Sequence, residues 1–170
     1  MRTPRRSTRL RGVLGVAGVL IAGVGGLAVY AYVRYLAVDR YGAVGGDLTV
    51  EAHTVTGLGS ALVTNTGYAL YTFPPDDRRR VTCTGGCATA WPPLVVPTGA
   101  RLVAGDGVEP RLLGTVPGPG GGRVVTYHGW PLYTYLGDAD PFKAAGQATD
   151  ADGGYWYILR PSGQVVTAQG

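Results

Sequence analysis

The sequence has few residues of the kinds that bind haem or structural metals. Its 170 residues include two cysteines, two histidines and one methionine, Met1. It has no Cys-x-x-Cys-His segment for haem attachment, and Met1 alone cannot supply an internal axial ligand. Catalytic-triad, phosphate-loop and dinucleotide-binding signatures are also absent. We therefore expect no cofactor, no bound metal and no enzymatic activity.

The net positive charge of the chain comes from its first residues. The formal net charge is +4, and five arginines within the first eleven residues leave −1 for the rest of the chain. A nucleic-acid-binding surface requires Lys and Arg clustered on the folded part of a protein. The sequence therefore gives no reason to expect nucleic acid as a partner.

An uncharged, apolar stretch of 22 residues follows these arginines, from Gly12 to Val33. A helix of this length spans roughly the 30 Å of a hydrocarbon core, and the arginine excess before it places the N-terminus in the cytoplasm. We predict a basic cytoplasmic tail at 1–11, a transmembrane signal anchor at 12–33, a stalk with a first strand at 34–57 and an extracytoplasmic domain at 58–170. The predicted location is the cell membrane, crossed once. A cleavable secretory signal is the alternative, although its apolar core is normally shorter, about 7–15 residues.

The remaining sequence is rich in turn-forming residues and in large aromatic residues. The chain has 29 Gly and 12 Pro, typical of many turns and short strands, and its 11 Tyr and 3 Trp indicate a packed core. We predict an all-β domain of about eight strands, sandwich or barrel-like. The clearest expected elements are a strand in Asp47–Val55, hairpins within 61–73 and 123–136, a strand at Tyr155–Leu159 and a turn at 161–163.

A hexapeptide pattern of aromatic, Thr, aromatic, two loop residues and Asp occurs twice, 62 positions apart. The copies are Tyr71-Thr72-Phe73-Pro74-Pro75-Asp76 and Tyr133-Thr134-Tyr135-Leu136-Gly137-Asp138, and the match extends upstream without a gap. A duplicated unit explains this pattern, and we place repeat 1 at about 58–97 and repeat 2 at about 120–161. Strand alternation puts the repeated aromatic residues, Tyr71, Phe73, Tyr133 and Tyr135, on a core face.

Two other aromatic residues, Tyr68 and Trp130, have the opposite strand parity. They are candidates for a ligand-stacking surface, together with His128 in the neighbouring turn. His128 is also explained as a simple turn residue, as its counterpart in repeat 1 is Thr66. His53 has no partner in the sequence.

Asp76 and Asp138 end the two motifs. We expect each carboxylate to cap backbone N–H groups in the turn after its strand, and a cation ligand or acid/base group is the alternative. The charge run that begins at Asp76 and includes Arg78–Arg80 is predicted to be a solvated loop. The acidic residues after Asp138 make a calcium site conceivable, but the later Glu of an EF-hand loop is missing.

Cys83 and Cys87 are the only cysteines, and both lie in the predicted extracytoplasmic part, where disulfides persist. The spacer Thr84-Gly85-Gly86 allows them to pair, so we predict a structural disulfide. A redox-active thiol pair is the functional alternative, although such pairs usually have the spacing Cys-x-x-Cys. A metal site is a third possibility, with His53 and His128 as the available softer ligands.

These motifs together resemble a bacterial family known as the secreted repeat of unknown function, whose lipoproteins carry a Yx(F/W/Y)xxD motif. Both hexapeptides fit that motif, and Cys83-Thr84-Gly85-Gly86-Cys87 followed by Trp91-Pro92-Pro93-Leu94 is similar to a second family segment. The resemblance covers about residues 58–161 and implies an exported, cell-surface protein without assigned catalytic residues. Many relatives are anchored through a lipidated Cys. Here no Cys precedes Cys83, so we expect the transmembrane segment to replace the lipid.

The sequence therefore predicts a membrane-anchored extracytoplasmic β-domain with a non-enzymatic binding role or an association with the cell envelope. Its expected partners are the membrane and an envelope component or envelope protein. One alternative is a redox, electron-transfer or metal-handling accessory that uses Cys83 and Cys87. Another is a carbohydrate-binding module that uses Tyr68 and Trp130.

Overall fold

The computed structural model describes residues 46–167, which fold into ten short strands and three short helical segments. The predicted cytoplasmic tail, the predicted transmembrane segment and most of the stalk lie outside the described residues. Within residues 46–167, no helix has the length and apolar character needed to cross a membrane. The all-β prediction is confirmed for this part of the chain.

The strands are short because glycine and proline interrupt the apolar runs. They are β1 (Leu48–Val55), β2 (Gly59–Thr64), β3 (Tyr71–Thr72), β4 (Val95–Val96), β5 (Leu102–Ala104), β6 (Leu113–Pro117), β7 (Arg123–Tyr127), β8 (Trp130–Pro131), β9 (Thr149–Ala151) and β10 (Gly154–Ile158). The helical segments are η1 (Pro74–Asp76), α2 (Gly86–Ala90) and η2 (Pro110–Leu112). Proline at the start of η1 and η2 supplies the fixed φ of a first helical turn.

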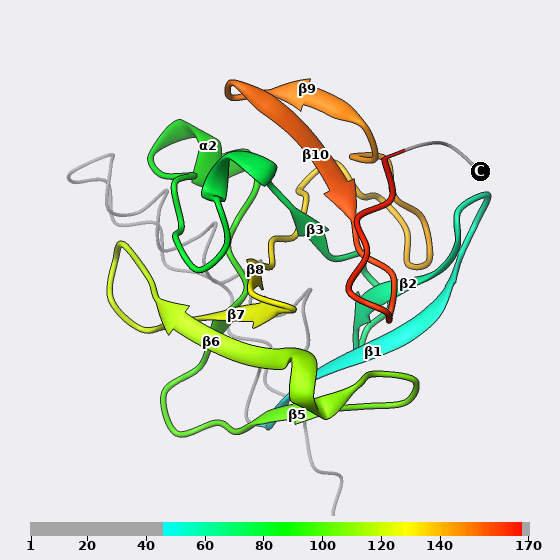
Figure 1. Ribbon diagram of the computed structural model, residues 1–170, viewed down its shortest axis with the longest axis horizontal. Helices are drawn as coiled ribbons and strands as arrows, with labels where there is room; N and C mark the ends of the chain where they lie inside the picture. Colours follow the sequence, from blue (N-terminus) through cyan, green and yellow to red (C-terminus); the bar gives the residue numbers. More distant parts are fainter. Residues whose placement is uncertain (1–45, 168–170) are drawn as a thin grey trace, which may run out of the picture.

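Residues 46–167 form three small open sheets, with strand orders β2-β1-β5, β3-β10-β9 and β4-β7-β6; β8 also pairs with β7. In Figure 1 the β9–β10 hairpin lies at the top and the β6–β7 hairpin lies below it, with β1 and β2 to the right. Single bridges connect these sheets, among them Tyr71 with Tyr133 and Pro93 with Tyr133. The sheets therefore form one continuous fold around the repeated motif.

The strands predicted in 47–55 and at 155–159 agree with the structure, which differs from the other predictions at several places. The residues before Phe73 do not form a full hairpin strand with β2, because β3 pairs with β10 and only Val63 and Ala69 bridge locally. The sequence interpretation also missed β4, β5, β6 and β9, of which β6 is the longest and pairs with β7 over five residues. Gly114 and Pro117 make β6 look like a loop in sequence, but β6 is an outer strand of its sheet, where proline is tolerated.

Two groups of buried side chains fill the interior. The first is aromatic and surrounds the repeated motif, with Tyr71, Phe73, Trp91, Tyr133 and Trp156 among its members. The second is mostly aliphatic and lies between β1, β2 and β7, with Leu48, Leu62, Leu70, Val125 and Leu132 among its members. Burial of this apolar surface is the main favourable contribution to folding.

Candidate functional site

The two repeated aspartates are buried and bind tyrosines of the opposite repeat. The hydroxyl of Tyr71 donates to both carboxylate oxygens of Asp138 at 3.0 Å, and the hydroxyl of Tyr133 donates to Asp76 at 2.6 Å. Each carboxylate also accepts a backbone N–H from the loop that follows it, at 2.8 Å, from Thr82 in repeat 1 and from Ala145 in repeat 2. The loop contacts have the form that the sequence predicts, but the exchange between repeats does not follow from it.

The tyrosines of these pairs are held in their protonated form. Burial raises the pKa of the Tyr71 phenol well above its ordinary value, and the negative charge of Asp138 adds to this effect. Burial also raises the pKa of Tyr133, with a further contribution from its hydrogen bond to Asp76. Both phenols remain donors at neutral pH. The carboxylates they bind are enclosed and tie the two repeats together.

Four aromatic rings form a stack in which members of the two repeats alternate. Phe73 stacks on Trp156 at 4.4 Å between ring centroids, Trp156 on Trp91 at 4.1 Å, and Trp91 on Tyr135 at 4.0 Å. Phe73 and Tyr135 occupy equivalent positions of the hexapeptide, so the stack repeats the exchange seen in the Tyr–Asp pairs. Tyr71, Phe73 and Tyr133 are buried and Tyr135 is partly buried, all within or against the aromatic core.

Cys83 and Cys87 form a disulfide, with their Cα atoms 5.3 Å apart. Cys83 is buried and packs within the aromatic core, and Cys87 lies in α2. Both cysteines line an open hollow of about 540 Å³ together with Phe73 and Asp152. No described residue is a free cysteine.

The acidic loop after Asp138 does not gather carboxylates around one point. Asp140 pairs with Lys143 at 2.7 Å, and Asp150 lies in β9. Among residues 46–167 no three His, Cys, Asp or Glu side chains are grouped as metal ligands. The Nε2 atom of His53 lies within hydrogen-bond distance, 3.0 Å, of a Glu51 carboxylate oxygen on β1, and His53 does not line the cysteines' hollow.

A second open hollow, of about 500 Å³, contains two of the residues that the sequence marks as a ligand surface. His128 and Trp130 line it, whereas Tyr68 does not. The full lining is Arg78, His128, Trp130, Arg160, Gly163, Gln164 and Val165. We call this the arginine–tryptophan hollow. Three separate segments build it: the loop after η1, the turn between β7 and β8, and the turn after β10.

An unusual backbone conformation places Arg78 in the arginine–tryptophan hollow. Asp77, Arg78 and Arg79 have φ angles of 47°, 42° and 71°, a left-handed run without glycine. Each such residue costs roughly 1–2 kcal/mol. The N–H of Arg79 donates to the carbonyl of Gly129 at 2.8 Å, which fixes the loop on the β7–β8 turn. The guanidinium carbon of Arg78 then lies 5.0 Å from the ring centroid of Trp130, within the range of a cation–π contact.

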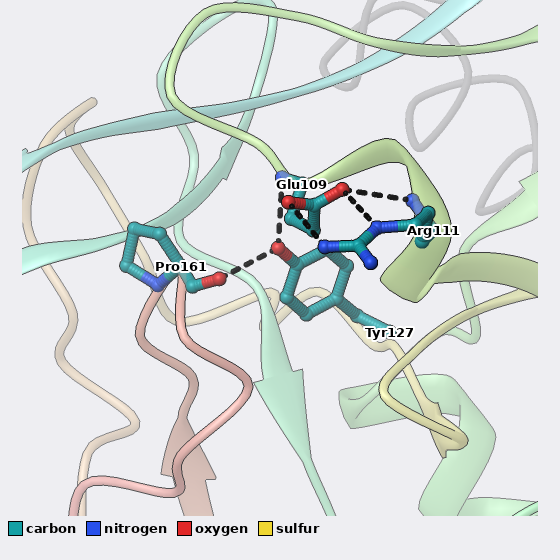
Figure 2. A network of polar contacts seen from close by, with 4 residues as sticks. All are labelled: Glu109, Arg111, Tyr127 and Pro161. Atoms are coloured by element: carbon teal, nitrogen blue, oxygen red, sulfur yellow. Dashed lines mark hydrogen bonds and ion pairs between the residues drawn. The ribbon is translucent and has the colours of Figure 1, made fainter.

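The other two walls of the hollow are held by the β7–β8 turn and by Tyr127. His128 and Gly129 both have positive φ, as a two-residue hairpin turn requires, and Gly163 packs directly against the His128 side chain. Figure 2 shows the hydroxyl of Tyr127 between two backbone groups: it donates to the carbonyl of Pro161 at 2.7 Å and accepts from the N–H of Glu109 at 3.1 Å. The same figure shows Glu109 paired with Arg111. Tyr127 thereby fixes the turn that carries Gly163 and Gln164.

The two halves of the duplication differ at this position. In the other half, the N–H of Phe142 donates to the carbonyl of Gly67 at 2.8 Å, which is the counterpart of the bond between Arg79 and Gly129. There the side chain of Phe142 lies against Gly67, and its ring centroid is 5.4 Å from that of His53. The duplicated scaffold is therefore the same, while the residues presented on it differ.

The sequence interpretation missed Arg78, Arg160 and Gln164. Arg78 belongs to a charge run that we predicted to be a solvated loop, and it is indeed exposed. The left-handed backbone that turns it toward Trp130 has no glycine to signal it. Arg160 follows a strand in sequence, and nothing local shows that the next turn folds back onto His128.

The chain matches a protein family described as a secreted repeat of unknown function, over residues 53–95 and 114–160. The two matched segments correspond to the two repeats, and the second begins at β6. This confirms the resemblance seen in the hexapeptides. No curated protein and no solved structure matches the chain.

Proposed function

Because the chain belongs to the family described as a secreted repeat of unknown function, we propose that it is an extracytoplasmic binding module that holds a cell-envelope component at the arginine–tryptophan hollow. The observation that carries this proposal is the difference between the two halves. The same scaffold presents Arg78 and Trp130 on one side and Phe142 on the other. Packing of the core explains the aromatic and Asp residues that the two repeats share. Binding explains why the residues at the surface of the two halves differ.

The lining of the hollow supports binding and offers little for covalent catalysis. None of its seven residues carries a carboxylate, a thiol or a hydroxyl group. His128 therefore has no nucleophile beside it within the hollow that it could activate. The walls are fixed by the bond from Arg79 to Gly129 and by the contacts of Tyr127, and such preorganisation lowers the entropic cost of binding.

Retention on isolated cell-wall material tests this function. Full-length protein in nanodiscs is incubated with purified wall fragments and sedimented, alongside the variants Trp130→Ala and Tyr155→Ala. Tyr155 is 49% exposed and lies outside the hollow, so it is a matched aromatic control. We expect at least a fivefold loss of retention for Trp130→Ala and none for Tyr155→Ala. Equal retention of all three proteins would count against the hollow, and no retention of the wild type would count against the function.

We also propose that residues 12–33 anchor the module in the membrane with the β-domain outside. The support is the apolar stretch preceded by five arginines, together with the secreted character of the family. Protease added to intact spheroplasts should remove the residues after about position 40 and leave a short membrane fragment. Complete protection of the chain would overturn this topology, and a chain beginning after the apolar stretch would show that a signal had been cleaved.

A further inference from the structure

The arginine–tryptophan hollow contains two guanidinium groups that no carboxylate neutralises. Within the described residues, neither Arg78 nor Arg160 forms an ion pair, whereas Arg101 pairs with Asp47 and Arg111 pairs with Glu109. The Arg160 guanidinium donates one hydrogen bond, to the carbonyl of Leu58 at 3.4 Å. A guanidinium has five N–H donors, so most of its capacity remains for another acceptor.

The position of Arg78 argues against a neutral sugar stacked on Trp130. Stacking of a sugar needs an open aromatic face, and here the Arg78 guanidinium lies over the ring at 5.0 Å. The strained backbone of residues 77–79 holds it there, together with the bond from Arg79 to Gly129. Strain of this kind persists where the surrounding structure enforces it, often at binding sites. Trp130 therefore supports Arg78 and does not offer its ring face to a sugar. The hollow favours a ligand group that binds arginine.

We propose that the ligand group bound in this hollow is an oxyanion, either a carboxylate or a phosphate of an envelope polymer. Arg78 and Arg160 would donate to its oxygens, since the planar fork of arginine matches both groups. The side-chain amide of Gln164 offers a further donor in the same lining. Trp130 is the positioning residue that holds Arg78 through its ring. This inference rests on the proposed function and specifies its ligand.

The exposure of the site determines how strong such binding is. Arg78 is exposed and Arg160 is half-buried, so solvent and salt screen their attraction for one oxyanion. A single charged group therefore binds weakly and in a salt-dependent manner. Repeated charges on a polymer, met by many anchored copies of the module, strengthen retention by raising the effective concentration.

Three sugars that share one ring test the ligand class. Full-length protein in phosphatidylcholine nanodiscs is titrated with glucuronate, glucose 1-phosphate and glucose. The NMR signals of the Trp130 indole N–H and of the two arginine Nε–H groups report binding directly. We expect one or both anions to bind at least tenfold more tightly than glucose, and binding to weaken at least fivefold between 50 and 300 mM NaCl. The tighter of the two anions identifies a carboxylate or a phosphate as the natural group.

Variants assign the roles of the residues. Arg78→Gln and Arg160→Gln should each weaken anion binding at least fivefold, whereas Arg123→Gln should not, because Arg123 is an exposed arginine outside the hollow. Trp130→Phe should retain most of the affinity that Trp130→Leu loses, since a phenyl ring still attracts a cation. If Trp130→Leu retained as much affinity for the anion as Trp130→Phe, the role of Trp130 would be packing only.

Oxyanion binding can be ruled out without ruling out binding of wall material at the hollow. Equal affinity for glucose and the anions, no effect of Arg78→Gln, or no binding of any of the three probes would each overturn the oxyanion assignment. If wall retention still depended on Trp130 in that case, the hollow would be a binding site for a neutral ligand.

Discussion

Tyr133 donates its hydroxyl hydrogen to Asp76 at 2.6 Å, across the boundary between the two repeats. Tyr71 and Asp138 make the equivalent contact in the opposite direction, and the backbones of Tyr71 and Tyr133 bind each other at 2.8 and 2.9 Å. The repeated motif therefore links the two repeats, because each buried aspartate accepts a hydrogen bond from a tyrosine of the other repeat. Its carboxylates are occupied by hydrogen bonds inside the protein, and neither aspartate lines the arginine–tryptophan hollow.

Removal of one cross-repeat hydrogen bond should destabilise the whole domain. Tyr133→Phe leaves a buried carboxylate oxygen without its donor, and we expect a loss of about 1.5–3 kcal/mol in the free energy of unfolding. Urea unfolding followed by far-UV circular dichroism measures the change. Tyr155→Phe is the control, and its surface position predicts a change within about 0.5 kcal/mol.

A double-mutant cycle tests whether the partner is the aspartate of the other repeat. Tyr133→Phe combined with Asp76→Asn should show a coupling of about 0.5–3 kcal/mol, and Tyr133→Phe with Asp138→Asn should show less. Equal coupling to both aspartates would contradict the exchange between repeats.

Alkaline pH should destabilise this protein more than the ionisation of its exposed tyrosines alone would. The pKa of Tyr71 and of Tyr133 is raised in the folded state, mainly by burial, so the native protein keeps protons that the unfolded chain releases above about pH 10. The stabilisation is fully present below that pH and is lost as the pH rises further, by up to about 1.4 kcal/mol per pH unit for each tyrosine.

Urea unfolding between pH 8 and pH 11 measures this loss. Stability that depends only weakly on pH up to about 10 and then falls steeply is the expected result. Tyr71→Phe should reduce the steepness of the fall by roughly a third to a half, because burial also raises the pKa of Tyr127. An unchanged slope in that variant would contradict the assignment.

The sequence predicted the repeats and most strand positions because period-2 alternation and turn residues are local signals. It could not show which aspartate each tyrosine meets, since both copies of the motif look alike and the answer depends on how the halves pack. It also missed β6, where Gly114 and Pro117 weaken the strand pattern although the pairing with β7 is regular.

The residues of the arginine–tryptophan hollow could be predicted from the sequence only in part. Strand parity singled out Trp130, and the turn position singled out His128, since both lie next to the second motif. Arg78 and Arg160 come from distant segments, so their approach to Trp130 is a tertiary property. Tyr68 had the same parity as Trp130 but does not line the hollow, because the two halves present different residues on one scaffold.

Gly163 should tolerate no side chain, since it touches His128. A Cβ built on Gly163 would lie 2.7 Å from the Cβ of His128, and its φ is +81°. Gly121 has the same φ but no atom within 4 Å of such a Cβ, which makes it a matched control. Both Gly→Ala variants lose about 1 kcal/mol from the left-handed backbone, and Gly163→Ala should lose a further 1–3 kcal/mol, approximately, from overpacking.

Thermal and urea unfolding of the two variants give the comparison. Loss of anion binding in folded Gly163→Ala, with binding retained in Gly121→Ala, would also show that this contact shapes the hollow. Equal destabilisation of the two variants would contradict the tight contact with His128.

Reduction of the disulfide separates a structural role from a redox role. The bond between Cys83 and Cys87 closes a short loop, for which chain entropy predicts a stabilisation of only about 2 kcal/mol. Purified protein should show no free thiol, and Cys83→Ala/Cys87→Ala should lose about that amount of stability. Because neither cysteine lines the arginine–tryptophan hollow, oxyanion binding should be the same in this variant and in the wild type.

The redox alternative predicts a different result for the same proteins. If the cysteine pair served electron transfer, a thiol–disulfide equilibrium in glutathione buffers would show it readily reduced, near the potentials of dithiol oxidoreductases at about −120 to −270 mV. A structural bond should stay oxidised there and require a potential below about −300 mV. Cys83 is 3% exposed and packs within the aromatic core, whereas labile disulfides are typically exposed, so we expect the structural outcome.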